Sequence, residues 1–285
     1  MGSKRPDIVL TNDDGIDAPG LEAVYDRLTE IGDVTVVAPS SDNSGIGRVL
    51  SMGRSTPIAL GDGTEQIELE APDYSWEVPF RPHELGYEVV GTPADCVVAA
   101  VSAIEVEPDV IVSGCNPGPN VGLSVLERSG TVSAAVEAAH LGVPGVAVSS
   151  TATGDEGTGF AVEADFVGQL VRFALGTGLF ETVDYLNALV PPSVPERVVV
   201  TEPSATHNVS AALKESAGRF VFTHTAFEEL RNGREGSDEA GTDRRAIGRD
   251  EASVSPLTLR DGPVESERLR AFAERYRPRV EPSSE

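Results

Sequence analysis

The sequence predicts an α/β protein with a mainly parallel sheet, and three observations support this fold class. Between Asp7 and Ser150, short β-branched runs alternate with segments of helical periodicity, as in consecutive βαβ units. The chain has 285 residues, of which 40% are apolar, so it can bury a substantial core. Polar, glycine-rich loops follow several predicted strands, and this is where open α/β sheets bind ligands.

The first predicted elements alternate regularly. Residues 8–10 are typical of a buried strand, and a helix with Pro19 in its first turn follows. A second strand covers residues 34–37 and ends at Pro39. Residues 53–87 show only weak alternation, which predicts an antiparallel excursion or hairpin.

The βα pattern then resumes with a helix, where Thr92 and Asp95 form a predicted cap. Beyond Pro203 the pattern loosens: residues 232–251 predict a mobile loop and residues 266–276 a last amphipathic helix. The segments in between are predicted as a strand at 110–112, a helix at 131–141, a strand at 146–148, a helix at 160–175 and a strand at 197–201.

Acidic residues dominate the charge, because 22 Lys and Arg stand against 46 Asp and Glu, giving a net charge of -24. Such a surface repels nucleic-acid polymers and anionic membranes, so we expect the chain to bind neither. The acid-rich, lysine-poor composition fits a protein kept soluble in a salty medium.

Cys96 and Cys115 lack a CxxC or Cys/His cluster, which argues against zinc and disulfides. Residues 1–6 lead into no apolar run, so we expect a cytoplasmic protein.

Two adjacent carboxylates, Asp13 and Asp14, follow the first predicted strand. Holding both ionised at a sheet edge is costly unless a cation lies between them. Alternatively, one aspartate caps the next helix and the other forms an Asx-turn. These residues alone leave the two interpretations open.

Later loops offer further oxygen donors at the same expected edge. Residues 38–45 carry hydroxyls, an amide and an acid, although alone they resemble an ordinary turn. Residues 113–122 place two asparagines among glycines and prolines, a rigid backbone that a ligand can approach closely. A predicted helix begins at residues 129–131, and the free N–H groups at its start could bind a phosphate. Alternatively, Ser129 or Thr131 is simply the N-cap of this helix. Two aspartates, a serine and an asparagine could together hold Mg²⁺ or Mn²⁺, the layout of a metal-assisted phosphohydrolase.

Five segments match one known family in order and spacing. They are residues 11–15 with 18–20, 37–39 with 44–45, 91–96, 113–120 and 129–132. Over roughly residues 8–149 the chain resembles the SurE family of metal-dependent 5'-nucleotidases, and the archaeal, salt-adapted subgroup in particular. The resemblance implies a Rossmann-like three-layer sandwich. It also implies hydrolysis of nucleoside 5'-monophosphates by a metal-bound water, with some members cleaving 3'-nucleotides or short polyphosphate.

The resemblance also implies the site residues and the organisation of the chain. One Mg²⁺ or Mn²⁺ per subunit would be bound by Asp13, Asp14, Ser44 and Asn116, with Asp13 and Asp14 also catalytic. The phosphate pocket would be lined by Asn12, Gly45, Asn120, Ser129, Gly130 and Thr131. Residues 5–202 would form the catalytic core, with a β excursion near 53–90, and residues 203–285 a C-terminal extension. This extension, comprising a hairpin or arm, a helix and a frayed tail, would assemble a homodimer or homotetramer.

Of three other interpretations, two lack a required sequence feature and one stays open. A haloacid-dehalogenase-type phosphatase needs two aspartates separated by one residue, and a receiver-like module needs a lysine after a late strand; neither feature is present. A non-catalytic, Mg²⁺-dependent nucleotide-binding regulator is the remaining alternative, because a sequence shows a site but no turnover. Asp42 and Asp95 are interpreted as a turn residue and a helix cap, and Cys115 as a packing residue.

Overall fold

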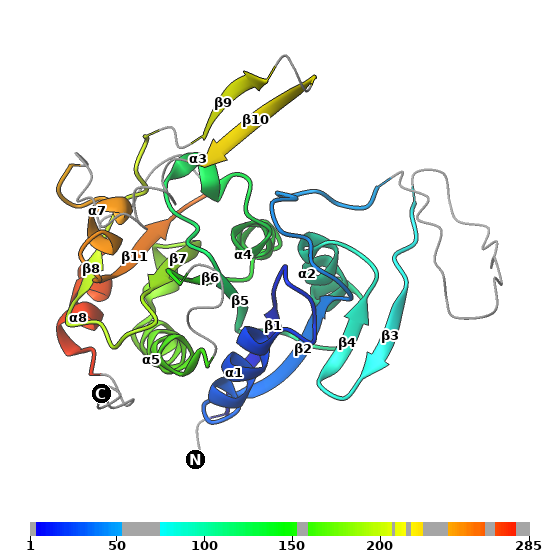
Figure 1. Ribbon diagram of the computed structural model, residues 1–285. Coiled ribbons are helices and arrows are strands. Elements are labelled where there is room, and N and C mark those ends of the chain that lie inside the picture. The colour runs from blue at the N-terminus through cyan, green and yellow to red at the C-terminus, as the bar shows by residue number, and fades with distance from the viewer. Residues whose placement is uncertain are drawn as a thin grey trace.

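The computed structural model describes residues 4–52, 75–152, 159–206, 209–214, 218–224, 239–259 and 266–277. Within these residues the chain is an α/β fold with a mostly parallel central sheet, as predicted (Figure 1). The weak alternation near residues 66–70 and the tail beyond residue 277 lie outside the described residues.

The described strands form one large sheet and a separate hairpin. The order in the large sheet is β3-β4-β2-β1-β5-β6-β7-β11-β8, in which β4 to β7 run parallel. The antiparallel excursion is confirmed where it is described, because β3 pairs antiparallel with β4 at the sheet edge. The strands are β1 (Asp7–Thr11), β2 (Asp33–Pro39), β3 (Phe80–His83), β4 (Gly86–Val89), β5 (Val110–Pro117), β6 (Gly145–Ser150), β7 (Tyr185–Val190), β8 (Val198–Val200) and β11 (Ala252–Leu257), with β9 (Val209–Lys214) and β10 (Arg219–His224) in the hairpin.

Helices cover both faces of the sheet, so the core has three layers (Figure 1). Alternation along β1 explains this, because Leu10 packs with Leu21 and Phe166 on one face. Val9 packs with Val97 on the other face. The helices are α1 (Pro19–Leu28), α2 (Pro93–Ser102), α3 (Leu123–Leu126), α4 (Gly130–His140), α5 (Ala161–Thr177), η1 (Leu179–Glu181), α7 (Asp243–Ile247) and α8 (Glu267–Arg275).

The helix starts follow from local sequence. Thr92 and Asp95 form a reciprocal capping box at the start of α2, as predicted. Pro19 occupies the first turn of α1, where its missing N–H has no helical partner to lose. Ser129 caps α4 by accepting a hydrogen bond from the Val132 N–H. No described helix is long and apolar enough to cross a bilayer.

The last third of the chain returns to the core. β11 pairs antiparallel with β7 and parallel with β8, so it lies inside the large sheet. Leu269 and Phe272 of α8 are buried in the main apolar cluster. The predicted loop at 232–251 is wrong in its second half, where α7 forms. The β9–β10 hairpin projects away from the layers (Figure 1).

The strand order places the candidate site. The chain builds outward from β1 to β2 and β4, then returns to β5 on the other side of β1. The gap between the carboxyl ends of β1 and β5 is therefore a topological switch point, where open α/β sheets bind ligands. Asp13 and Asp14 follow β1, and Asn116 lies near the end of β5.

Candidate functional site

Asp13 is fixed by donors from two other elements. Its carboxylate accepts a 2.7 Å hydrogen bond from the Thr131 hydroxyl and another from the Thr131 N–H. The Nδ2 of Asn116 donates to the same Oδ1 of Asp13. The β5 register shifts between Ser113 and Asn116, and such an irregularity re-aims the side chains that follow it. Residues 13, 116 and 131 are therefore brought together although they lie far apart in the sequence.

Asp14 lies beside the same amide and faces the loop after β2. The Ser44 hydroxyl lies 3.5 Å from Asp14 Oδ1, and the Asn116 side chain also donates to the Asp14 carboxylate. Burial, followed by the negative charges of Asp13 and Asp42, raises the pKa of Asp14 to about 7. Burial also raises the pKa of Asp13, against the lowering effect of the Thr131 hydrogen bonds.

These four residues fit a hard divalent cation. Asp13, Asp14, Ser44 and Asn116 offer carboxylate, hydroxyl and amide oxygens, the donor types that Mg²⁺ and Mn²⁺ prefer. The Oδ1 of Asn116 is buried and accepts no hydrogen bond from any described residue. None of the ion pairs found in the described ranges involves either aspartate. A buried acidic pair without a cationic side chain is the environment that a bound cation would relieve.

The expected ligand set contains two acidic side chains, Asp13 and Asp14. Accordingly, the described residues contain no group of three or more His, Cys, Asp or Glu side chains arranged to hold a metal ion. Asp42 lies close enough to affect the pKa of both aspartates, but its Oδ1 accepts the Ser44 N–H at 2.7 Å, the predicted turn. The alternative that an aspartate caps the next helix is wrong, because Ala18 is the N-cap of α1 and no side chain caps it.

The predicted phosphate-pocket residues surround this cluster in different ways. Asn12 is buried, and its side chain exchanges hydrogen bonds with the backbone of Gly15, so it shapes the loop. Asn120 donates to the Ser149 hydroxyl at 2.6 Å. Gly45 adopts a left-handed φ of 74°, and a Cβ there would meet nothing within 4 Å, so this backbone faces open space.

The start of α4 lies against Asp13. A Cβ on Gly130 would lie 2.6 Å from Asp13 Oδ2, so only glycine allows this approach. Ser129 is the N-cap of α4, which confirms that interpretation, and Thr131 uses its N–H and hydroxyl on Asp13. The positive end of the α4 dipole therefore faces the acidic pair.

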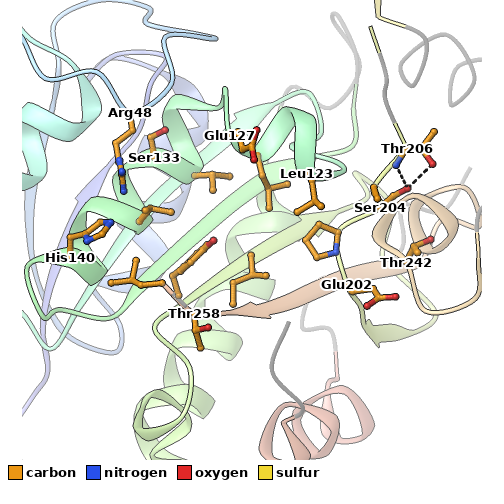
Figure 2. Close-up of a pocket in the computed structure, with 18 of the residues that line it drawn as sticks. Arg48, Leu123, Glu127, Ser133, His140, Glu202, Ser204, Thr206, Thr242 and Thr258 are labelled. Carbon is orange, nitrogen blue, oxygen red and sulfur yellow. Dashed lines mark hydrogen bonds between the residues drawn. The ribbon is translucent and has the colours of Figure 1, made fainter. Parts of the chain in front are cut away.

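A separate cleft of about 1390 Å³ is lined in part by Val132, Ser133, Val136 and His140 of α4 (Figure 2). Arg48 and His140 line one end, and Ser204, Thr206 and Thr242 line the other (Figure 2). None of the predicted site residues lines this cleft. The candidate site is thus the polar cluster at the sheet edge.

Two buried acids that support the site loops carry no predicted role. Asp243 is fully buried and accepts the N–H of Gly122 at 2.7 Å and that of Ser204 at 2.8 Å. Glu163, 1% exposed, accepts the Ser150 hydroxyl at 2.6 Å. The sequence does not distinguish Glu163 from Asp165, the other acid near the start of the same predicted helix.

Comparison with known proteins identifies the family. Residues 8–211 match the family described as survival protein SurE. A protein named 5'-nucleotidase SurE from Natronomonas pharaonis is 42% identical, with 95% of this chain and 99% of that protein covered. One of the same name from Haloarcula marismortui is 41% identical, with 96% of each chain covered. Both organisms are halophilic archaea, which agrees with the acid-rich, lysine-poor composition.

The fold is shared with a solved structure of the same family. The crystal structure of the SurE protein from Aquifex aeolicus superposes with a TM-score of 0.68 at 29% identity, covering 89% of this chain and 94% of that one. Since the family match spans more than half of the chain and the archaeal relatives cover nearly all of it, this chain belongs to the SurE family.

Proposed function

We propose that the chain is a divalent-metal-dependent phosphomonoesterase that hydrolyses nucleoside 5'-monophosphates to a nucleoside and phosphate. One observation carries this proposal: Asp13, Asp14, Ser44 and Asn116 converge at the switch point between β1 and β5. Membership of a family whose relatives are named 5'-nucleotidase supports the substrate class.

The four oxygen ligands would hold one Mg²⁺ or Mn²⁺ per subunit. When bound, such an ion polarises the phosphoryl group and lowers the pKa of a coordinated water. Asp13 is held by three donors, two from Thr131 and one from Asn116, so its carboxylate has a fixed position. Asp14 has weaker contacts to Ser44 and Asn116, so it is the better candidate to orient the attacking water and accept its proton.

The phosphate would enter between the α4 start and the loop after β2. Gly45 leaves its side of this space open, and the N-terminal end of α4 favours negative charge. Gly130 permits the close approach of helix and carboxylate. Asn120 and Asn12 hold the two adjoining loops through Ser149 and Gly15. Ser129 and Thr131 complete the wall of the proposed phosphate pocket.

The assembly and the location form part of the same proposal. The β9–β10 hairpin exposes Leu213, Phe220 and Phe222, which suit contacts in a homodimer or homotetramer. Residues 203–285 would provide this contact while β11 and α8 complete the core of residues 5–202. Cys96 and Cys115 are free, buried thiols, in keeping with a reducing cytoplasm.

A substrate panel in high salt tests the proposal. The protein would be assayed with 5'-AMP, 5'-GMP, 3'-AMP and tripolyphosphate, each with Mg²⁺, Mn²⁺ or EDTA. We expect phosphate release from the 5'-monophosphates with a divalent cation and none in EDTA; activity on the other two substrates would extend the specificity. Full activity in EDTA contradicts the metal requirement. Metal-dependent nucleotide binding without phosphate release would identify a regulator instead.

A further inference from the structure

We propose that Glu163 is a positioning residue that holds the loop of residues 113–122, which contains Asn116, in place. This role rests on the proposed metal site, because Asn116 is one of its expected ligands. Glu163 lies in the first turn of α5 and does not touch the acidic pair, so it would act through the backbone of the loop.

A continuous chain of hydrogen bonds connects Glu163 to that loop. The Ser150 hydroxyl donates to Glu163 Oε1 at 2.6 Å and accepts the Ala152 N–H at 3.2 Å. The Ala152 carbonyl in turn accepts the Gly118 N–H at 3.1 Å. Gly118 lies two residues after Asn116, so the buried carboxyl governs where this loop leaves β5.

The charge of Glu163 also reaches Cys115, the residue just before Asn116. Burial, then the charge of Glu163 and then that of Asp14, raise the pKa of the Cys115 thiol. The two carboxyls therefore approach the loop from different elements, α5 and the β1 loop. Glu163 is 1% exposed, so it is not a surface residue that happens to lie nearby.

Truncation of this carboxyl should loosen the loop and weaken metal binding. Groups that hold metal ligands in place typically contribute about 10- to 100-fold to metal affinity. We expect Glu163→Ala to raise the Kd for Mn²⁺ by about this factor, measured by calorimetry on the full chain without substrate. Glu163→Gln keeps an oxygen that accepts the Ser150 hydroxyl, so it should restore the affinity to near that of the unmodified chain.

Asp165→Ala is the matched control on the same helix. Asp165 is 5% exposed and contacts Arg27 at 3.2 Å and Gln169 at 2.8 Å. Its loss should lower the stability and leave the Mn²⁺ affinity unchanged. Equal weakening by both alanine variants would overturn the proposal, as would an unchanged affinity in Glu163→Ala.

A second readout does not depend on metal. Amide hydrogen exchange in the peptide covering residues 113–122 should quicken in metal-free Glu163→Ala and stay unchanged in Asp165→Ala. If Glu163→Ala does not fold, Ser150→Ala breaks the same chain of hydrogen bonds and should show the same two effects. Slow exchange of this peptide in the folded variants would overturn the positioning role. An unmodified chain that binds no Mn²⁺ would overturn the proposed function, and the exchange experiment would still decide the role of Glu163.

Discussion

The Thr131 hydroxyl donates a 2.7 Å hydrogen bond to Oδ1 of Asp13, joining the start of α4 to the loop after β1 across 118 positions of sequence. The Thr131 N–H donates to the same carboxylate, so the helix start holds this acid in place. Thr131 therefore serves Asp13 directly and would contact a phosphate only at the rim of the cluster. Because of this hydrogen bond, the position of Asp13, an expected metal ligand, depends on the position of α4.

Asp13→Asn should reduce phosphate release by more than about 100-fold, because it removes the charge that a cation needs. The amide keeps an oxygen that accepts the Thr131 and Asn116 hydrogen bonds, so the fold should persist. Phosphate release from 5'-AMP, Mn²⁺ affinity and circular dichroism measure the three effects. Asp17→Asn is the control, since Asp17 is 91% exposed on its side chain and pairs with His83. An active Asp13→Asn enzyme would remove Asp13 from the ligand set.

Gly130→Ala should displace Asp13 without changing any charge. The new Cβ would lie 2.6 Å from Asp13 Oδ2 and 2.7 Å from its Cβ, closer than real contacts allow. We expect activity and Mn²⁺ affinity to fall together, by about 10-fold or more. In the control Gly176→Ala, within α5, a Cβ meets nothing within 4 Å, and a helical alanine should stabilise the fold by roughly 0.5–1 kcal/mol. Normal metal binding by Gly130→Ala would mean that α4 can shift without moving Asp13.

The position of the candidate site could be predicted because it depends on local features. A buried strand followed by polar residues places Asp13, Asp14 and Asn116 at one edge of any parallel sheet. The details could not be predicted, since they arise from contacts between distant segments. The register shift before Asn116 and the approach of Gly130 to Asp13 have no local signature.

The helix predicted at residues 266–276 is confirmed as α8 (Glu267–Arg275), but strand β11 escaped prediction for a similar reason. β11 contains Pro256, which usually argues against an internal strand. It is accommodated because β8 pairs only with Ala252–Val254, so Pro256 has a neighbouring strand on one side alone. The insertion of β11 between β7 and β8 is a long-range pairing, and neither periodicity nor composition encodes it.

The hairpin should control assembly. Register places Phe220 opposite Leu213 on one face, and these side chains are 68% and 57% exposed; Phe222, on the same face, is 72% exposed. The double variant Phe220→Ser/Phe222→Ser should lower the mass in high salt to that of a monomer, measured by light scattering or sedimentation. Val221 lies on the opposite face, so Val221→Ser should assemble normally. An unchanged mass in the double variant would exclude this face as the contact.

Glu163 should make the stability of the metal-free protein depend on pH. Burial raises the pKa of Glu163 above its ordinary value of 4.5, while the Ser150 hydrogen bond lowers it. Between the ordinary and the raised value, the folded state binds more protons than the unfolded state, so the free energy of unfolding falls as pH rises. Above the raised pKa the carboxyl is ionised in both the folded and the unfolded state, so the free energy of unfolding stays lowered by the cost of burying its charge and no longer changes with pH. Glu163→Gln lacks this group, so its stability relative to the unmodified chain should increase with pH and then level off.

Denaturant midpoints of both proteins, measured from pH 4 upward in high salt with EDTA, test this sign. Ser150→Ala removes the hydrogen bond that lowers the pKa of Glu163, so its stability should keep falling to a higher pH than that of the unmodified chain. Parallel curves for Glu163→Gln and the unmodified chain would show that Glu163 titrates alike in the folded and unfolded states. The hydrogen bond from the Ser150 hydroxyl would then fully offset the effect of burial on the pKa of Glu163, and ionising this carboxyl would not destabilise the folded protein.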